Sequence, residues 1–194
     1  MIRLVHADDA AACAAIYRPA VDGSWVSYEE IAPDAAVMRE RIAASSTTYP
    51  WLVYAEGDDV LGYAYASKHR ERAAYRWSVD VSIQLDERAR GRGIGTALYR
   101  VLFRILQLQR FHRLYAGIAL PNDASVALHL ASGFTYVGIY TEVGFKAGFW
   151  GDVVWYERAI GTTSSVPPAE PIPLAQLDAV RLANALNEGA PGSP

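Results

Sequence analysis

The sequence has few of the features that would cross-link a protein or place it in a membrane. Only one of its 194 residues, Cys13, is a cysteine, which excludes an internal disulfide and a metal–thiolate cluster. No apolar run approaches the roughly 20 residues of a membrane-spanning helix. No N-terminal stretch has the pattern of a secretory leader. We therefore expect a cytoplasmic protein with its own hydrophobic core and no membrane partner.

The chain also lacks a strong net charge. Its formal charge is −3 and its isoelectric point is about 5.8, so no general attraction to nucleic acid is expected. Arginines do gather between Arg70 and Arg113, and their spacing indicates a site for a small anion rather than a DNA-binding face. No internal repeat is apparent, and the length suits one domain of ordinary size.

Hydrophobic periodicity predicts strands with interspersed helices. Strands are expected at 2–5, 51–56, 60–67, 77–85, 114–120, 137–143 and 153–158, and helices at 10–17, 33–47, 96–110 and 123–131. The segment 77–85 has the clearest pattern, because its apolar residues alternate with Ser78, Asp80, Ser82 and Gln84. The order predicts an α/β or α+β domain of about seven strands with a mostly antiparallel beginning.

The composition changes after residue 160, which we take as the end of a domain spanning 1–160. Residues 161–173 are rich in Thr, Ser and Pro, and this composition predicts a linker. Leucines then recur at near-helical spacing, which predicts a short helix over 174–187 within the extension 161–194. That helix would dock on the domain or on a partner subunit, and a frayed tail is the alternative.

A glycine-rich turn, Arg90-Gly91-Arg92-Gly93-Ile94-Gly95, joins the strand at 77–85 to the helix that follows. Glycine lets the backbone approach a ligand closely. The start of a helix directs free N–H groups and the positive end of the helix dipole at the same point. This arrangement predicts a binding site for a ligand that carries phosphate.

The turn resembles the R/Q-x-x-G-x-G/A signature of the GNAT superfamily of N-acetyltransferases. Further segments, 120–129, 133–134, 144–146 and 150–153, resemble its phosphinothricin and methionine sulfone acetyltransferase branch, so the resemblance covers residues 2 to about 159. It implies the acyl-CoA N-acyltransferase fold, a mixed and twisted seven-stranded sheet that is splayed at its centre and flanked by helices. It also implies acetyl-CoA as co-substrate, no metal, a small amino-acid-like acceptor and a homodimer.

The resemblance places acetyl-CoA along the end of the strand and over the glycine turn. The pantetheine arm would bond to the strand backbone, and the pyrophosphate would lie on the N–H groups of residues 91–96. The residues expected to bind the co-substrate are Ile83, Gln84, Leu85, Arg88, Arg90, Gly91, Arg92, Gly93, Ile94, Gly95, Thr96, Asn122 and Ser125.

Acetyl transfer requires an amine with a free lone pair, although an α-amine with a pKa of about 8 is mostly protonated at neutral pH. Asp80 is one candidate base, because it lies on the polar face of the strand that leads into the turn. The resembled branch has the longer glutamate at this position, so a bridging water is the alternative. His129 is the second candidate, on one helix face with Asn122 and Ser125, as proton acceptor or as donor to the leaving thiolate. Cys13 has no activating partner nearby, which favours direct attack in a ternary complex.

The acceptor side is predicted from the resemblance alone. It places Tyr28 and Glu29 in a loop that closes the acceptor pocket, Arg72 and Tyr75 on an acidic substrate, and Lys146 and Trp150 in a loop that crosses to the neighbouring subunit. Phosphinothricin, methionine sulfone and methionine sulfoximine are the acceptors implied. The alternatives are acetylation of a protein N-terminus or lysine, and a noncatalytic acyl-CoA-binding module. A mononucleotide-binding domain is disfavoured because the turn lacks the Walker lysine.

Overall fold

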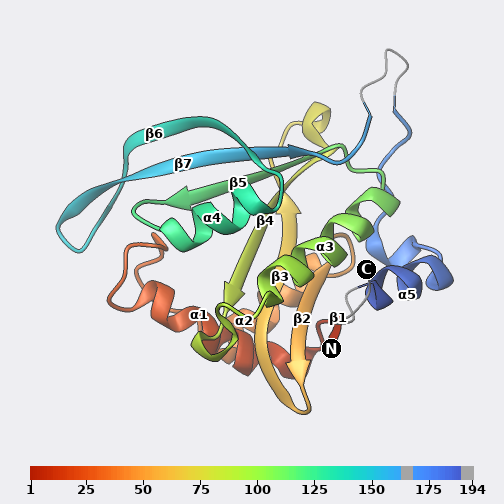
Figure 1. Cartoon of the computed structure of the whole chain (residues 1–194), viewed down its shortest axis with the longest axis horizontal. Helices are drawn as coiled ribbons and strands as arrows, with labels where there is room; N and C mark the ends of the chain where they lie inside the picture. Colours follow the sequence, from red (N-terminus) through yellow and green to blue (C-terminus); the bar gives the residue numbers. More distant parts are fainter. Residues whose placement is uncertain (163–167, 189–194) are drawn as a thin grey trace.

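The computed structural model describes residues 1–162 and 168–188, which form a single mixed sheet with helices on both of its faces (Figure 1). The strands are β1 (Ile2–Leu4), β2 (Trp51–Glu56), β3 (Asp59–Lys68), β4 (Ser78–Leu85), β5 (Arg113–Ala119), β6 (Thr135–Lys146) and β7 (Phe149–Ala159). Their spatial order is β1-β2-β3-β4-β5-β7-β6, and only the β4–β5 pair is parallel. The predicted mixed, seven-stranded sheet is confirmed.

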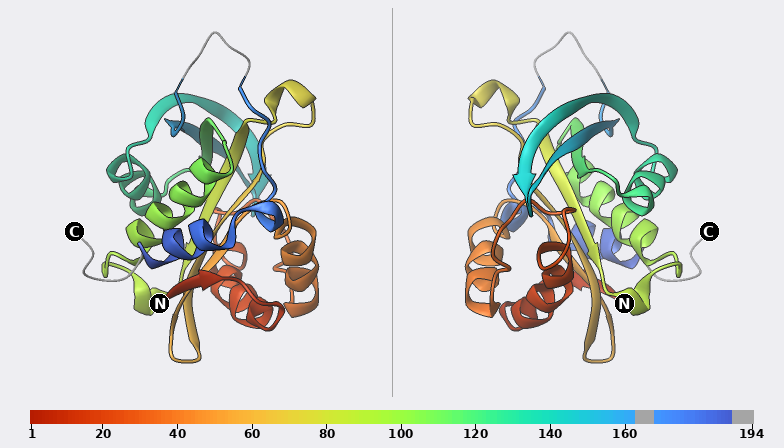
Figure 2. Two further views of the ribbon diagram at one scale, coloured as in Figure 1. Left: turned by 90° about the vertical axis from the view of Figure 1, so that its right-hand side faces the viewer. Right: turned by 90° about the vertical axis from the view of Figure 1, so that its left-hand side faces the viewer.

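The α-helices are α1 (Ala10–Val21), α2 (Ala35–Ser45), α3 (Ile94–Leu108), α4 (Asp123–Ala131) and α5 (Ala179–Asn187). Short 3₁₀ turns lie at Ala7–Asp9, Ala73–Tyr75, Glu87–Ala89 and Leu174–Gln176. Helices α1 and α2 cover one face of the sheet, and α3, α4 and α5 lie on the other (Figure 2). Within the described residues, no helix combines the length and the apolar character needed to cross a bilayer.

The alternation in β4 decides which side chains meet which layer. Val79 and Val81 are buried in the core that includes α3. Because successive side chains of a strand point to opposite faces, Asp80, Ser82 and Gln84 face the α1–α2 side. The polar face of β4 is therefore turned toward the first two helices of the chain.

Helix boundaries follow from local capping. The carboxylate of Asp34 accepts hydrogen bonds from the N–H groups of Ala36 and Val37, both at 2.9 Å, so α2 begins at Ala35. Helix α3 begins two residues before the predicted start, because Gly93 adopts a φ of 75° and serves as its N-cap. Gly133 has a φ of 78° after α4, the left-handed conformation predicted for it.

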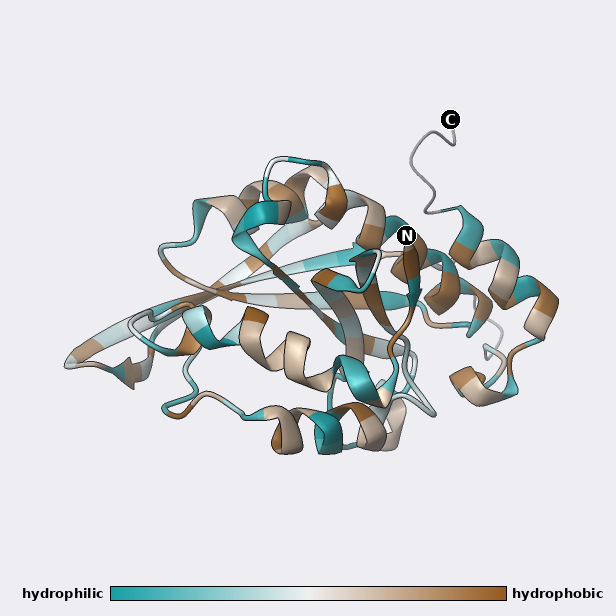
Figure 3. Cartoon of the chain, turned by 90° about the horizontal axis from the view of Figure 1, so that it is seen from below, coloured by the Kyte–Doolittle hydropathy of each residue, from teal (hydrophilic) through white to brown (hydrophobic). Residues whose placement is uncertain are grey.

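The β6–β7 hairpin is longer than the predicted strands 137–143 and 153–158, and it extends beyond the body of the molecule (Figure 3). Its turn has positive φ values at Ala147 and Gly148, the geometry of a two-residue hairpin. Gly144 and Gly151 fall between the two predicted strands, but they are paired strand residues. Both lie against the ring of Tyr28, and a Cβ on Gly144 would approach that ring to 2.7 Å. These glycines serve close packing rather than a turn.

The described part of the C-terminal extension is docked on the domain. Leu174 and Ala185 are buried in the core that contains α3. The side-chain amide of Gln109 donates hydrogen bonds to the carbonyl oxygens of Ile172 and Thr48, at 2.8 and 2.7 Å. Residues 163–167 of the predicted linker, and the predicted helix stop at 189–192, lie outside the described residues.

Candidate active site

The sheet opens between β4 and β5. These two strands pair only from Ser78–Arg113 to Asp80–Tyr115, and beyond this point they diverge (Figure 1). From residue 81 to Leu85, β4 is paired with β3 on one edge, while the edge toward β5 has no partner strand among the described residues. An unpaired edge of this kind binds an extended ligand as an added strand. The splay predicted at the centre of the sheet is confirmed.

The glycine turn lies at the end of β4. Gly91 and Gly93 have φ values of 70° and 75°, and a Cβ on either residue would meet no atom within 4 Å. No side chain caps the first turn of α3, so its first N–H groups and the positive end of a 15-residue helix face open space. Thr96 is exposed in the same turn. This site has the geometry and the charge that a pyrophosphate requires.

Three arginines surround the turn on the surface. The Arg88 guanidinium contacts the carboxylate of Asp86 at 3.0 and 3.1 Å, and Arg92 contacts Glu56. Arg90 lies 3.9 Å from a carboxylate oxygen of Glu87. Exposed ion pairs of this kind contribute little to stability, so all three side chains remain available for exchange onto an anion.

A cavity of about 180 Å³ lies on the α1–α2 side of the splay. Its lining includes Tyr17, Ser27, Arg41, Tyr65, Ser82 and Gly117. The Tyr65 ring stacks on Trp51 with 4.2 Å between centroids, which gives the cavity an aromatic wall. A small concave site with an aromatic wall and a few polar groups is typical of small-molecule binding.

Arg41 brings charge to this cavity and is held in place by Glu29. The guanidinium donates two parallel hydrogen bonds of 2.8 Å to the carboxylate, and the Tyr17 hydroxyl donates a third of 3.0 Å. The Arg41 bond is the main reason that the pKa of Glu29 lies below its ordinary value. Glu29 thus orients groups that line the cavity, although it is not itself part of the lining.

Tyr28 and Lys146 connect the loop between α1 and α2 to the β6–β7 hairpin of the same chain. The Lys146 ammonium donates to the carbonyl oxygens of Val21 and Ser27, at 2.7 and 2.8 Å, and the Tyr28 hydroxyl lies 3.4 Å from the carbonyl of Asp152. Both side chains therefore support the wall of the cavity. Trp150, near the tip of the hairpin, is 62% exposed.

Arg72 and Tyr75 lie apart from the cavity lining. Both are exposed, at the 3₁₀ turn between β3 and β4, and Tyr75 approaches the ring of His69 instead. Arg41 and Tyr17 were missed because helical periodicity alone does not show which residues meet a cavity. The pattern of aromatic residues in β2 and β3 predicts strands but does not indicate that these side chains line a cavity.

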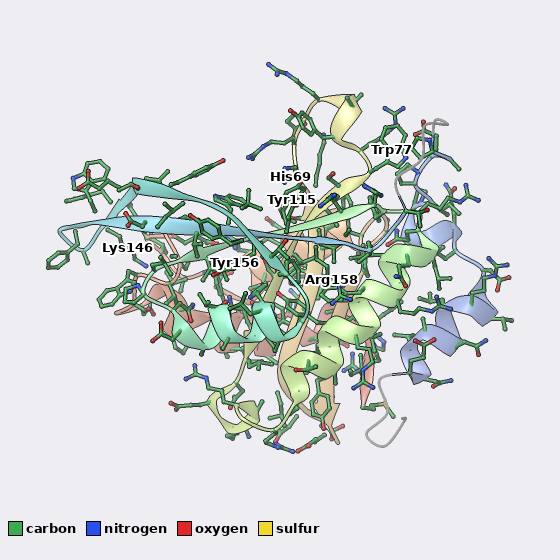
Figure 4. All side chains as sticks on the ribbon, turned by 45° about the horizontal axis from the view of Figure 1, so that its top comes forward. His69, Trp77, Tyr115, Lys146, Tyr156 and Arg158 are labelled. Atoms are coloured by element: carbon green, nitrogen blue, oxygen red, sulfur yellow. The ribbon has the colours of Figure 1, made fainter. Side chains whose placement is uncertain are left out.

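Asp80 forms a close pair with a residue that the sequence did not single out. Nδ1 of His69 lies 2.7 Å from Oδ1 of Asp80, and the imidazole stacks on Tyr115 with 4.3 Å between centroids (Figure 4). Burial raises the pKa of Asp80, while the hydrogen bond from His69 and the charge of Arg70 oppose this shift. Antiparallel pairing of β3 with β4 is the signal that brings His69 to Asp80, but only once the register is known.

His129 is only 3% exposed, and both of its ring nitrogens are occupied. Nδ1 lies 2.7 Å from the carbonyl oxygen of Ser125, and Nε2 lies 2.8 Å from the Tyr99 hydroxyl. Burial lowers its pKa. The structure therefore gives His129 the position of a core residue and does not support the predicted role as a proton carrier. Asn122 caps α4 by accepting a hydrogen bond from the Ser125 N–H, at 3.2 Å.

Among residues 1–162 and 168–188, no group of three or more His, Cys, Asp or Glu side chains is placed to hold a metal ion. The site is built instead from a backbone cradle, an open strand edge, an aromatic cavity and the His69–Asp80 pair.

The chain matches the model of the acetyltransferase (GNAT) domain over residues 2–155. It is 49% identical over 106 residues to a phosphinothricin N-acetyltransferase of Streptomyces coelicolor, an alignment that covers 55% of this chain and 62% of that protein. Identity to the phosphinothricin N-acetyltransferase of Alcaligenes faecalis is 36% over 169 residues, covering 86% of each chain. The crystal structure of a GNAT superfamily phosphinothricin acetyltransferase from Sinorhizobium meliloti, in complex with AcCoA, has a TM-score of 0.83 at 36% identity and covers 91% of this chain and 97% of that one.

Proposed function

This chain belongs to the acetyltransferase (GNAT) family, and we propose that it moves the acetyl group of acetyl-CoA to the α-amine of a small amino-acid analogue. Phosphinothricin, methionine sulfone and methionine sulfoximine are the proposed acceptors. The observation that carries the proposal is that β4 and β5 separate beyond Asp80 and Tyr115, so that an open strand edge lies between two candidate sites. A phosphate cradle lies at the end of β4, and a cavity of about 180 Å³ lies on its α1–α2 side.

The residues present fit acetyl-CoA. Residues 91–96 would hold the pyrophosphate through backbone N–H groups, with Arg88, Arg90 and Arg92 supplying positive charge. The open backbone edge of Ile83–Leu85 would pair with the amides of the pantetheine arm. We propose that Asn122 and Ser125, at the start of α4, contact the same arm.

Acetyl-CoA supplies an activated acyl group, and the chain supplies position and proton transfer. Once the amine has lost a proton, its nitrogen forms a bond to the thioester carbonyl carbon, and the carbon–sulfur bond then breaks. Backbone N–H groups in Val81–Ile83, on the open edge of β4, would stabilise the oxyanion that forms in between. The His69–Asp80 pair, on the cavity side of β4, is the proposed proton-accepting group. No covalent enzyme intermediate is required.

The test is thiol release from acetyl-CoA across an amine panel, with products identified by mass spectrometry. The panel contains the three proposed acceptors, methionine, glutamate, and peptides with a free N-terminus or a lysine. We expect one of the three analogues to give the highest kcat/KM and to carry the acetyl group on its α-nitrogen. Acetylation of peptides alone would replace this proposal with a protein acetyltransferase. Binding of acetyl-CoA without thiol release from any amine would indicate a noncatalytic module.

We also propose that the protein is a homodimer through the β6–β7 hairpin. Large apolar side chains on this hairpin are 44–73% exposed, namely Tyr136, Val137, Ile139, Tyr140, Val143, Phe145, Phe149 and Trp150. An apolar surface of this kind is unusual on a monomer, and a second copy of the hairpin offers a matching partner.

The reducing cytosol, where a single thiol stays unoxidised, is the proposed compartment.

Light scattering during size-exclusion chromatography tests the dimer. Phe149→Glu places a charge in the proposed interface and should yield a monomer, whereas Val180→Glu, at an equally exposed position on α5, should not change the mass. A wild-type protein that elutes as a monomer at micromolar concentration would contradict the dimer and leave the proposed reaction standing.

A further inference from the structure

The geometry of His69 and Asp80 determines which nitrogen carries a proton. An ionised carboxylate only accepts hydrogen bonds, so the 2.7 Å contact between Nδ1 and Oδ1 requires a proton on Nδ1. In the neutral ring the lone pair then lies on Nε2. Within the part of the chain that the structure describes, Nε2 has no hydrogen-bond partner. Asp80 therefore fixes the tautomer of the His69 ring, and Nε2 is the nitrogen that can accept a proton.

Three elements hold the imidazole in place. His69 directly follows β3, Asp80 lies on β4, and Tyr115, which stacks on the ring at an angle of 14°, lies on β5 (Figure 4). Tyr75 meets the ring edge-on with 6.2 Å between centroids. The His69 side chain is only 10% exposed, so its orientation is set by packing rather than by solvent. Such fixation is what a group requires to take a proton in a defined direction.

The pair lies at the mouth of the splay. Asp80 and Tyr115 are the last paired residues of β4 and β5, and the next residues on the same faces, Ser82 and Gly117, line the cavity. Two residues of a strand span about 7 Å, the length of one side chain. A small amine bound beside Ser82 would thus lie about one side-chain length from the Asp80 position, a span that one bridging water can complete.

We propose that His69 is the proton acceptor of the acetyl transfer and that Asp80 is its positioning residue, an inference that rests on the proposed function. Nε2 takes a proton from the acceptor ammonium, which leaves the amine lone pair free to form the bond to the carbonyl carbon. When the carbon–sulfur bond breaks, the second proton of that nitrogen goes to the thiolate and gives CoA with a free thiol. The proton on His69 then passes to solvent. Asp80 stabilises the imidazolium throughout, because its carboxylate remains bonded to Nδ1.

Several charged or titratable groups face this ring. Asp80 comes from β4, Tyr115 from β5, Tyr75 from the 3₁₀ turn and Arg70 from the adjoining backbone. Asp80 is the only one of them in hydrogen-bond contact with the ring among the described residues. Its removal therefore takes away the group that keeps the proton on Nδ1 and the lone pair on Nε2.

The test compares His69→Phe, His69→Gln and Asp80→Asn with wild type in kcat and KM between pH 6 and 10. The control His112→Gln changes a histidine that packs against Gly161. Loss of the base should lower kcat at pH 7 about 100-fold in both His69 variants. The acetyl-CoA Kd, measured by calorimetry, should stay within about twofold of wild type, because the contacts to the cradle are intact. Above the pKa of the acceptor amine the rates should approach wild type, since the substrate then arrives deprotonated.

A residue with a merely structural role would not give this recovery at high pH. If wild type transfers acetyl groups and both His69 variants keep its kcat at pH 7, while Asp80→Asn does not, Asp80 is the base and this inference is overturned. If wild type releases no thiol with any amine, the proposed function fails first, and this inference with it. His69→Gln keeps the polarity of the site, so it gives an answer even where His69→Phe fails to fold.

Discussion

The hydroxyl of Tyr99 donates a hydrogen bond of 2.8 Å to Nε2 of His129, and both side chains are buried. Nδ1 donates to the carbonyl of Ser125, and burial favours the neutral ring by lowering its pKa, so Nε2 accepts the hydroxyl proton and neither nitrogen is free. We expect Tyr99→Phe to lower the free energy of unfolding by about 1–3 kcal/mol, because Nε2 loses its donor in a buried place. Urea unfolding measures this loss, with the exposed Tyr136→Phe as control. If Tyr99→Phe instead keeps its stability and loses most of its kcat, His129 takes part in proton transfer.

The same buried imidazole predicts how stability depends on pH. Burial lowers the pKa of His129 in the folded protein below the ordinary 6.5, the value expected in the unfolded chain. As the pH falls through 6.5, the unfolded state binds a proton that the folded state does not, so the free energy of unfolding should decrease. His129→Gln should weaken this decrease between pH 7 and pH 5, whereas His112→Gln should retain it. Denaturant titrations at several pH values provide the measurement, and equal slopes in wild type and His129→Gln would contradict the prediction.

The strand–turn–helix unit around the phosphate cradle was predictable because its information is local. Alternation over 77–85 identifies a half-buried strand, and the glycines at 91 and 93 adopt the positive φ values that their type allows. Local patterns failed where glycine had a different purpose. Gly144 and Gly151 lie outside the predicted strands 137–143 and 153–158, but they are strand residues that make room for Tyr28, whose position depends on a distant loop.

The His69–Asp80 pair, proposed here to accept the proton, shows the same limit in the site. Asp80 was predicted because it lies on the polar face of a clear strand, whereas His69 follows a different strand and reaches Asp80 only through the β3–β4 register. Arg41 lines the cavity through the packing of α2, which no short pattern describes. The residues expected around acetyl-CoA are contiguous, so a local pattern can name them, whereas the cavity is assembled from separate elements that no local pattern joins.

Gly93 should be more important for acetyl-CoA than for stability. Gly93 and Gly57 both have positive φ values, and a Cβ would meet no atom within 4 Å at either position. Substitution by alanine at either position should therefore lower the free energy of unfolding by about 1–2 kcal/mol through backbone strain. Only Gly93→Ala should also weaken acetyl-CoA binding, by about tenfold or more, because its Cβ enters the space proposed for the pyrophosphate. Calorimetric titration with CoA compares the two, and equal affinities would argue against the cradle.

The contact between Tyr28 and Gly144 is expected to couple the hairpin to the cavity wall. Gly144→Ala should cost about 1–3 kcal/mol, because the new Cβ overlaps the ring. In a Tyr28→Ala background the same change should cost far less, so a double-mutant cycle should show a coupling energy of about 1 kcal/mol or more. Gly138→Ala, on the same strand with open space around it, is the matched control. If the effects of Gly144→Ala and Tyr28→Ala on stability are additive, the Tyr28 ring moves away from the new Cβ without cost.

Gln109 should hold the C-terminal arm to the domain. It is fully buried at the end of α3, and its amide nitrogen donates to both Thr48 and Ile172. In Gln109→Leu the carbonyl of Ile172 loses this donor and the carbonyl of Thr48 keeps only the N–H of Leu174, which should cost about 2 kcal/mol and expose residues 168–188 to proteases. The exposed Gln107→Leu removes a single hydrogen bond, to Ile160, and should cost much less. Helix α3 separates Gln109 from the glycine turn by about 22 Å. Acetyl transfer measured below the melting temperature should therefore keep its wild-type KM for acetyl-CoA, and a raised KM would show that the arm supports the cradle as well.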